Sequence, residues 1–518
     1  MKTSVHKIPF KNIKLLSKTA MDYVYNTQKL AQFIELAPTF ENFKKSSESR
    51  KKVNREVLVS VLEKQNINTN KKSLANIELL KKKNTFTVTT GHQICLFTGP
   101  LYSLYKIIST INLAQELDKK HPDCHFVPVF WMATEDHDFE EINHLFLGNE
   151  KLSWNSKQEG PVGRFSLSDM DLFLDELQSK NQSDLTKKLC QFYKNSTTLA
   201  EAHRKMVDCL FGENGLVIID ADYRELKKAM IPIFTKELTE RKIEHTINDL
   251  STKLTEQGYK KQVTPRSINL FYQEKGLRER IVFEEGKYKV LNTKLEFTET
   301  EILETLNLSP EKFSPNVVLR PIYQEKILPN LGYIGGPGEL AYWLQLKNAF
   351  QLHEVDFPLL VLRNSAVLIP SHITRKIEQL PFELPEYFED IDTLNKQFLT
   401  ENSDIDFDPE INEIEKLFSL AKEKASQIDL TLEKTVIAEL KRAQNSIKKI
   451  EKKALKAEKK NHTVALNRIE KIKNSFFPGG TFQERKSNVI DFYEDDLIKN
   501  LIDNLISLED SLTLIELK

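Results

Sequence analysis

Ionisable side chains crowd into one short stretch of the chain, Glu135-Asp136-His137-Asp138, directly after the apolar run Phe126–Ala133. Carboxylate and imidazole groups clustered in this way can bind a divalent metal, hold an ammonium group or act as a general base. The stretch contains no HExxH sequence, so a zinc protease is not indicated. The structural alternative is a helix start whose carboxylates complement the helix dipole. We expect a functional cluster.

The same cluster continues to His144, and its geometry depends on local structure. If the segment is helical, His137 and Glu141 share one face at a spacing of four residues, with His144 next along that face. Such a face could present several metal ligands or proton acceptors together.

A second candidate site is the polar turn Gly91-His92-Gln93, which follows a β-branched run and precedes a helix. Thr98 and Gly99 lie just before the proline that starts this helix. Backbone N–H groups near a helix start bind phosphate or carboxylate, and a histidine or glutamine there can stabilise developing negative charge. Neither GxGxxG nor GxxxxGK[ST] is present, so the dinucleotide fingerprint and the P-loop are both excluded.

Further along the chain, Gly335, Gly336 and Gly338 form a turn that ends at Glu339. Glycines at such a turn allow the backbone to approach a ligand closely. A plain Gly/Pro turn before a helix is an equally good interpretation.

Two isolated arginines, Arg266 and Arg320, lie near predicted strand ends. A guanidinium group there could pair bidentately with a carboxylate of a ligand. The alternative for each is a surface or salt-bridge role.

The elements that must position these groups are strands and helices in alternation. Residues 85–90 and 126–133 read as strands joined by a helix with apolar residues at helical spacing, and residues 215–220 and 358–364 read as further strands. Strands joined by such crossovers are parallel, and ligands bind beyond their carboxyl ends. The sequence therefore predicts an α/β protein in which both polar turns face one crevice. Pro128 favours an edge position or a distorted start for its strand.

Composition narrows the function classes. The chain has 518 residues with 74 Lys and Arg against 75 Asp and Glu, so a dedicated nucleic-acid binder is not expected. Its four cysteines form no CxxC pair, which favours reduced thiols. The start has no apolar signal segment, and no stretch is long enough to cross a bilayer. These observations predict a cytoplasmic protein with no membrane partner.

The predicted domains follow from these patterns. Residues 1–84 are expected to be N-terminal helices packing on the core, and residues 85–384 the parallel-sheet core with inserts near 145–214 and 240–313. The insert near 240–313 alternates as a small antiparallel sheet, and residues 317–321 also resemble a strand. Residues 385–475 carry apolar residues at alternating spacings of four and three, which is typical of a coiled coil. Residues 476–518 are predicted to be helices that return to the core.

Within residues 385–475, a break near Asp429 separates a first helix from a long second one, roughly 431–474. The pair is expected to form an antiparallel hairpin that pairs in cis or with a second protomer. Nine Lys and Arg with two Glu lie between Lys441 and Lys460, and we interpret them as solvated positions.

Six blocks of this chain, in order, resemble the BshC family, the cysteine-adding enzymes of bacillithiol biosynthesis. The blocks are TGHQICLFTGPLYSLYK, FWMATEDHDFEEINH, PVGR, TPRSINLFY, SPNVVLRPIYQEKILPNLGYIGGPGELAYWLQLK and FPGGTFQER. The resemblance covers essentially the whole chain. It implies a Rossmann-like core related to class I nucleotidyl-transferring synthetases, connecting-peptide inserts and a coiled-coil domain that promotes homodimers.

The resemblance implies a ligase that joins cysteine to the amino group of glucosaminyl-malate. Gly91, His92 and Gln93 fall where those synthetases place their first signature, whereas their second, a lysine-serine loop, is not visible. The activating nucleotide is therefore left open between ATP and another nucleotide, and so is the use of a metal. On this hypothesis His92 and Gln93 assist activation.

The remaining roles in the ligase hypothesis fall to charged groups. One of Asp136, His137 and Asp138 holds an ammonium group or acts as the base, and Arg266 or Arg320 pairs with malyl carboxylates. Two alternatives stay open: a metal-dependent hydrolase that uses the acidic cluster, and a coiled-coil assembly protein with an inactive nucleotide-binding fold.

Overall fold

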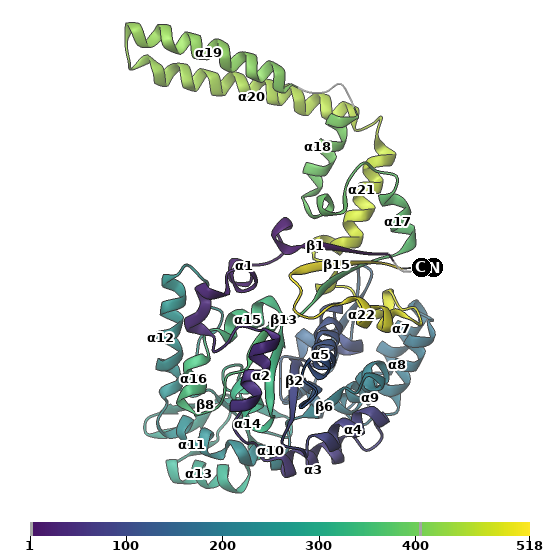
Figure 1. Cartoon of the computed structure of the whole chain (residues 1–518), viewed down its shortest axis with the longest axis vertical. Helices are drawn as coiled ribbons and strands as arrows, with labels where there is room; N and C mark the ends of the chain where they lie inside the picture. The colour runs from purple at the N-terminus through teal and green to yellow at the C-terminus, as the bar shows by residue number, and fades with distance from the viewer. Residues whose placement is uncertain (1–3, 403–406, 518) are drawn as a thin grey trace. The chain divides into compact units, whose positions relative to one another are not determined.

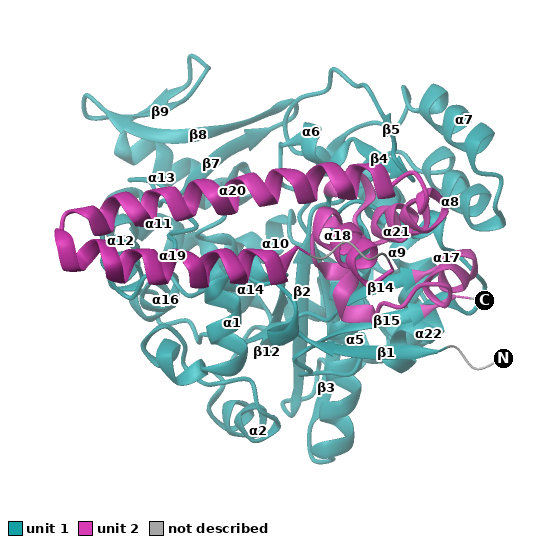
Figure 2. Cartoon of the chain, turned by 90° about the horizontal axis from the view of Figure 1, so that it is seen from above, with its two compact units in different colours: residues 1–368, 481–515 teal, residues 369–480, 516–518 magenta. Residues whose placement is uncertain are grey.

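The computed structural model describes residues 4–402 and 407–517. The chain divides into two compact units (Figure 2). Unit 1 contains residues 1–368 and 481–515, and unit 2 contains residues 369–480 and 516–518. The candidate site lies in unit 1.

Unit 1 is built on a sheet of five parallel strands, visible at the centre of Figure 1. In spatial order the strands are β13 (Leu359–Leu362), β12 (Asn330–Gly335), β2 (Thr85–His92), β3 (His125–Met132) and β6 (Val217–Asp220). Numbered along the chain, this order is 5-4-1-2-3. The chain therefore reverses direction across the sheet between β2 and β12, and such a switch point opens a crevice at the carboxyl ends of the strands. The predicted α/β architecture is confirmed.

The strands are buried on both faces. Val127 and Val129 of β3 belong to one apolar cluster and Phe126 to another, as expected for side chains that alternate across a strand. Strand β2 is also buried although it is rich in threonine, because Thr87 and Thr89 donate hydrogen bonds to Oδ1 of Asn330 in the neighbouring strand, at 3.0 and 2.8 Å. These side-chain bonds satisfy hydroxyls that burial would otherwise leave without partners.

Pro128 does not mark an edge. Strand β3 pairs with β2 along its whole length and with β6 from Val129 to Met132, so it is an interior strand; of the two alternatives for Pro128, an edge position or a distorted start, the edge position was wrong. The proline lies before the first residue that pairs with β6, where one side of the strand has no ladder.

Helix α5 (Leu101–Lys120) follows Pro100, which is its N-cap, and packs on β2 and β3. The other helices of unit 1 outside the inserts are α1 (Lys18–Tyr25), α2 (Phe40–Ser49), α3 (Arg55–Gln65), α4 (Lys71–Leu79), α6 (Phe139–Ile142), α10 (Arg224–Lys227), α11 (Ile231–Thr239), α14 (Arg320–Ile327), α15 (Pro337–Trp343), α16 (Lys347–Leu352) and α22 (Leu497–Asn504). Residues 317–321 do not form the predicted strand, because a turn there leads into α14.

Two groups of elements interrupt the parallel sheet. The first contains the hairpin β4 (His144–Leu147) and β5 (Glu150–Ser153) and three helices, α7 (Asp171–Lys180), α8 (Asp184–Lys194) and α9 (Leu199–Phe211). The second contains α12 (Lys242–Glu256), α13 (Glu299–Leu308) and an antiparallel sheet, which was predicted. Its strands, in the order β10-β9-β8-β7-β11, are β10 (Glu296–Phe297), β9 (Lys287–Val290), β8 (Leu277–Glu284), β7 (Leu270–Glu274) and β11 (Phe313–Pro315).

The two ends of unit 1 pair with each other. Strand β1 (Val5–Pro9) lies antiparallel to β15 (Ser511–Glu516), which also neighbours β14 (Ser365–Ile369). The prediction of helices throughout residues 1–84 and 476–518 was therefore wrong at both of these strands. The pairing joins segments about 500 residues apart, which local patterns do not encode.

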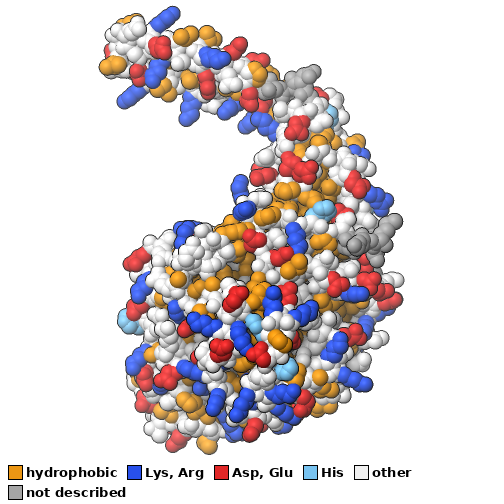
Figure 3. All heavy atoms as spheres, in the orientation of Figure 1, with side chains coloured by type: hydrophobic (Ala, Val, Ile, Leu, Met, Phe, Trp, Pro, Cys, Tyr) orange, Lys and Arg blue, Asp and Glu red, His pale blue; other side chains and the backbone are white. Residues whose placement is uncertain are grey.

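Unit 2 contains α17 (Ser371–Ile377), α18 (Ile391–Glu401), α19 (Asp408–Ile428), α20 (Leu432–Glu458) and α21 (Thr463–Phe476). Helices α19 and α20 pack on each other as the predicted antiparallel hairpin. The long second helix was predicted without a break, whereas residues 459–462 separate α20 from α21. Lys and Arg side chains line the α20 edge of the hairpin (Figure 3). Among the described residues, no helix is long and apolar enough to span a bilayer.

Candidate functional site

A pocket of about 730 Å³ lies at the carboxyl ends of β2, β3 and β12, where the order of the strands predicts a crevice. Its volume is in the range of small-molecule sites. Twelve of the fifteen candidate residues line it: Gly91, His92, Gln93, Glu135, Asp136, His137, Asp138, Arg266, Arg320, Gly336, Gly338 and Glu339. The structure thus brings both polar turns into one cavity.

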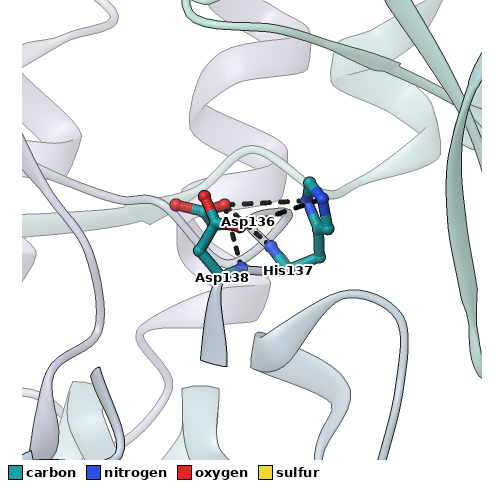
Figure 4. Close-up of side chains that lie close together, drawn as sticks. All are labelled: Asp136, His137 and Asp138. Carbon is teal, nitrogen blue, oxygen red and sulfur yellow. Dashed lines mark hydrogen bonds and ion pairs between the residues drawn. The ribbon is translucent and has the colours of Figure 1, made fainter. Parts of the chain in front are cut away.

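The acidic turn after β3 is ordered largely by Asp136 (Figure 4). One carboxylate oxygen of Asp136 accepts from the backbone N–H of His137 at 2.7 Å, and the other accepts from the side-chain amide of Gln93 at 2.9 Å. The same Gln93 amide donates to Glu141 at 2.7 Å. Gln93 therefore joins the two turns. Helix α6 begins only after Asp138, so the expected helical face shared by His137 and Glu141 does not form.

His137 contacts a buried arginine that the sequence did not single out. Nη1 of Arg278 lies 2.6 Å from Nδ1 of His137, and the guanidinium stacks 3.9 Å above the centre of the Phe271 ring. Arg278 also donates to the Ser314 hydroxyl and to the Pro315 carbonyl, at 3.1 and 3.3 Å. These contacts fix the guanidinium beneath the imidazole.

The possibility of a metal at the acidic turn can be judged from the same contacts. Ligand atoms of Asp136, His137 and Asp138 lie within 4.8 Å of one another. A guanidinium group only donates hydrogen bonds, so Nδ1 of His137 is already occupied by Arg278 and lies next to a positive charge. Both carboxylate oxygens of Asp136 already accept hydrogen bonds, one from the His137 N–H and one from the Gln93 amide. This donor set fits a divalent cation poorly.

Backbone contacts hold the acidic turn against the loop 161–164. The N–H of Val162 donates to the Asp136 carbonyl at 2.7 Å, and the N–H of Gly163 donates to the Thr134 carbonyl at 2.9 Å. A Cβ atom at Gly163 would lie 2.9 Å from that same carbonyl oxygen, so only glycine fits. Glu135 is paired with the fully buried Lys227. The PVGR block therefore holds the acidic turn in place through backbone hydrogen bonds.

On the opposite side of the pocket, every buried charge has a partner. Lys106 of α5 contacts the Gly91 carbonyl and pairs with Glu339 at 2.8 Å, and its side chain is 1% exposed. Glu339 also accepts from the Tyr333 hydroxyl and from the Gly336 N–H, both at 2.8 Å. Burial alone would raise the pKa of Glu339, but Lys106 and these hydrogen bonds lower it to about 2. Glu339 is ionised whenever the protein is folded near neutral pH.

His92 lies beside this ion pair. Burial and then the Lys106 ammonium lower the pKa of His92 to about 3. Its ring packs edge-on against Tyr102, with ring centres 5.1 Å apart. An imidazole with so low a pKa is neutral near pH 7 and offers an N–H donor without carrying a charge.

A second buried ion pair completes this side. Arg363 pairs with Glu484 through two hydrogen bonds, at 2.9 and 2.5 Å, and both side chains are nearly inaccessible. Glu484 belongs to the QER sequence near the C-terminal end of unit 1. We call this side the switch-point wall; it contains His92, Lys106, Glu339, Arg363 and Glu484.

The facing side carries arginines without carboxylate partners. We call it the insert wall; it contains Arg266 and Arg280 together with the buried Arg278. Arg320, at the start of α14, lies at the sheet edge over the rings of Trp131 and Tyr333 and also has no carboxylate partner in the part of the chain that the structure describes. Among the described residues, Arg266, Arg280, Arg320 and Arg485 line the pocket and have no ion-pair partner. A Cβ atom at Gly91 would lie 3.4 Å from Nη1 of Arg320, so the glycine leaves room at this guanidinium. Six arginines line the pocket against four carboxylates, which favours an anionic ligand.

The loop that carries Arg266 is fixed from behind by Asn269. Asn269 accepts from the Arg266 N–H at 3.0 Å and from the Asn316 amide at 2.9 Å. Its backbone N–H and its side-chain amide donate to the same oxygen of the buried Glu237, at 2.7 and 2.8 Å. Burial raises the pKa of Glu237 to about 7.

Three candidate residues do not line the pocket. Thr98 and Gly99 lie in a buried turn where Asn488 donates to the carbonyls of Phe97 and Gly99, both at 3.0 Å. Gly335 ends β12 and is buried beneath Glu339. These positions shape the turn and the strand end rather than the cavity surface.

Sequence reasoning missed Lys106, Arg278, Arg280, Arg363 and Arg485. Signals for two of them were present: Arg363 interrupts an otherwise apolar strand, and Lys106 lies between the apolar positions of α5. A charged residue in a buried element needs a partner, which is a reason to suspect a site. Arg278 and Arg280 alternate with Glu279 on β8 and resemble an ordinary solvated hairpin, so no local signal marks them.

Comparison with known proteins covers nearly the whole chain. A family model described as "Bacillithiol biosynthesis BshC, N-terminal Rossmann-like domain" matches residues 3–364, and one described as "Bacillithiol biosynthesis BshC, C-terminal coiled-coil domain" matches residues 366–517. A relative from Flavobacterium psychrophilum is 42% identical over 98% of this chain and 99% of its own. Relatives from Flavobacterium johnsoniae and Christiangramia forsetii are 42% and 40% identical over 97% and 94% of this chain, and 98% and 95% of theirs. All three are named "Putative cysteine ligase BshC".

Proposed function

This chain belongs to the BshC family of bacillithiol biosynthesis, and on that basis we propose that it is a cysteine ligase. The reaction is formation of an amide between the carboxyl group of cysteine and the amino group of glucosaminyl-malate. The product would be a low-molecular-weight thiol of the bacillithiol type.

One observation carries the proposal: a pocket at the switch point combines unpaired guanidinium groups with an acidic turn. Glucosaminyl-malate has two carboxylates on its malyl group and one amine on its sugar. Guanidinium groups suit the carboxylates, because they pair with them bidentately, and carboxylates suit the amine. The two ends of the substrate thus match the two kinds of group in the cavity.

Arg266 on the insert wall and Arg320 at the sheet edge are the proposed partners of the malyl carboxylates, and Arg280 joins them as a third unpaired guanidinium. The acidic turn then holds the amine, with Asp136, His137 and Asp138 as the candidate acceptors of its proton. Gln93 links this turn to His92 through its hydrogen bond to Asp136.

His92 is the proposed donor to the carboxyl oxygen of cysteine, on which negative charge develops during amide formation. Its low pKa keeps the imidazole neutral, so it stabilises the oxyanion by an N–H bond rather than by a full charge. The paired charges behind it, Lys106 and Glu339, hold the end of β2 in place.

Activation of the cysteine carboxyl needs a co-substrate, for which we propose ATP or another nucleoside triphosphate. Arg485, the one of the four unpaired guanidinium groups that is not assigned to the malyl carboxylates, is a suitable partner for its phosphates. The chain has neither a P-loop nor the dinucleotide fingerprint, so side chains rather than a glycine-rich backbone cradle would hold them.

The metal-dependent hydrolase is less consistent with the acidic turn, because Arg278 occupies the histidine nitrogen that a metal would need. We expect no tightly bound stoichiometric metal in the purified protein, and detection of such a metal by elemental analysis would favour the hydrolase again.

We further propose a cytoplasmic homodimer through the α19–α20 hairpin, which carries exposed apolar residues such as Leu417 and Ile437. Light scattering of the full chain and of a hairpin deletion tests the dimer.

Thiol profiling tests the proposed function in cells. Fluorescent labelling and mass spectrometry of cells with and without the gene should show loss of bacillithiol and accumulation of glucosaminyl-malate, both reversed by the wild-type gene. An unchanged thiol pool would contradict the proposed ligase function and would favour the hydrolase or the assembly protein.

A further inference from the structure

Three groups in the acidic turn could accept the amine proton, and their existing contacts separate them. Asp136 uses both carboxylate oxygens, one for the backbone N–H of His137 and one for Gln93. A carboxylate held in this way orders the turn, and taking up a proton would cost it a hydrogen bond. Asp136 is therefore a positioning residue.

His137 is excluded as a base by its contact with Arg278. A guanidinium group has no acceptor, so the 2.6 Å contact requires the lone pair on Nδ1 of His137, and the ring proton then lies on Nε2. Arg278 is itself fixed by Ser314, Pro315 and the Phe271 ring. The free edge of the imidazole thus presents an N–H donor.

Asp138 is the remaining group. It lines the pocket, its side chain is 59% exposed, and its carboxylate lies 3.9 Å from Nε2 of His137, beyond hydrogen-bond distance (Figure 4). A carboxylate in this position can receive a substrate amine from the cavity, and the Nε2–H of His137 lies beside it to orient either partner.

We propose that Asp138 is the base of the reaction and that Arg278 locks His137 as a donor; this assignment rests on the proposed function. The free amine of glucosaminyl-malate attacks the carbonyl carbon of the nucleotide-activated cysteine carboxyl. The new C–N bond forms, the bond from that carbon to the phosphate oxygen of the activating nucleotide breaks, and the phosphate leaves with the electron pair. The proton that the nitrogen loses passes to a carboxylate oxygen of Asp138.

Matched variants of the turn test the assignment. Asp138→Asn removes the base but keeps size, and kcat should fall roughly 100- to 1,000-fold with KM for glucosaminyl-malate changed much less. Glu140→Gln neutralises an exposed acid that does not line the pocket, and it should match the wild type. Retention of most of kcat by Asp138→Asn would overturn the proposal.

Two substitutions of His137 separate a donor from a base. His137→Gln keeps N–H groups near the position of Nε2 but cannot act as a base, so it should retain far more kcat than His137→Ala. Equal losses of at least 100-fold in both variants would show that His137 accepts the proton, contrary to the proposal.

The tautomer can be measured without any reaction. In protein labelled with ¹⁵N-histidine, long-range ¹H–¹⁵N spectra should show Nε2 of His137 protonated and Nδ1 bare, with the signal assigned by its absence in His137→Gln. A proton on Nδ1 would contradict the proposal that Arg278 holds His137 in the tautomer with a bare Nδ1. Since this result does not depend on turnover, an inactive wild type would contradict the proposed function separately.

Discussion

The two walls of the pocket treat charge in opposite ways. On the switch-point wall, Lys106 is paired with Glu339 and Arg363 with Glu484. On the insert wall, Arg266 and Arg280 have no ion-pair partner among the described residues. Charges buried with a partner have a structural task, because removal of either member leaves the other uncompensated. Unpaired charges that face a cavity are available to bind a ligand of opposite charge.

This difference also separates stability from binding. Substitutions of the paired charges on the switch-point wall should destabilise the fold, whereas substitutions of the arginines on the insert wall should leave the protein folded but unable to hold an anionic ligand. Such a division is expected when a rigid sheet edge supplies the reacting groups and an inserted subdomain supplies specificity.

The largest effect is expected from Lys106→Met. The Glu339 carboxylate would lose its ammonium partner, and the free energy of unfolding of unit 1 should fall by roughly 3 kcal/mol, as measured by urea unfolding followed by tryptophan fluorescence. Lys106→Met with Glu339→Gln should recover part of the loss. The exposed Lys81, which pairs with Glu78, is the control, and Lys81→Met should leave the urea midpoint unchanged. Equal midpoints for Lys106→Met and the control would remove the distinction between the walls.

A smaller effect, on binding alone, is expected from Arg280→Ala. Loss of a charge-assisted hydrogen bond to a ligand carboxylate should raise KM for glucosaminyl-malate roughly tenfold to 100-fold, with the urea midpoint unchanged. Arg442→Ala on the hairpin, which removes an exposed arginine outside the pocket, should leave KM at the wild-type value. If Arg280→Ala lowered the urea midpoint and left KM unchanged, Arg280 would contribute to stability and not to ligand binding.

The smallest effect concerns pH. The pKa of His92 is about 3 in the folded chain because of burial and the Lys106 ammonium, against 6.5 for an ordinary histidine. Between pH 6.5 and 3 the unfolded chain therefore binds a proton that folded His92 does not, and stability falls as the pH falls. His92→Gln removes this contribution, so the midpoint of acid unfolding should move down by roughly half a pH unit.

The matched control for the pH experiment is His245→Gln. His245 is highly exposed, with a side chain that is 85% accessible, so its removal should leave the acid midpoint in place. If His92→Gln and His245→Gln behaved alike, burial of His92 at the switch point would not explain the acid sensitivity.

Sequence patterns were sufficient to predict site residues where the order of elements along the chain also determines their position in the sheet. The turns after β2 and β3 follow buried strands joined by a helix, so chain direction alone places His92 and Asp136 at one edge. Patterns failed for partners brought together over long distances, as with Glu484 beside Arg363 and β15 beside β1. They also failed for Arg278 and Arg280, whose strand alternates like any exposed hairpin until the pocket is assembled.

The most direct test of the ligase is a reaction with purified protein. Wild-type protein would be incubated with cysteine, glucosaminyl-malate and ATP, with other nucleoside triphosphates in parallel, and the products identified by mass spectrometry. We predict an amide-linked thiol that depends on all three substrates and is lost in His92→Ala. Folded wild-type protein that forms no such product with any nucleotide would contradict it.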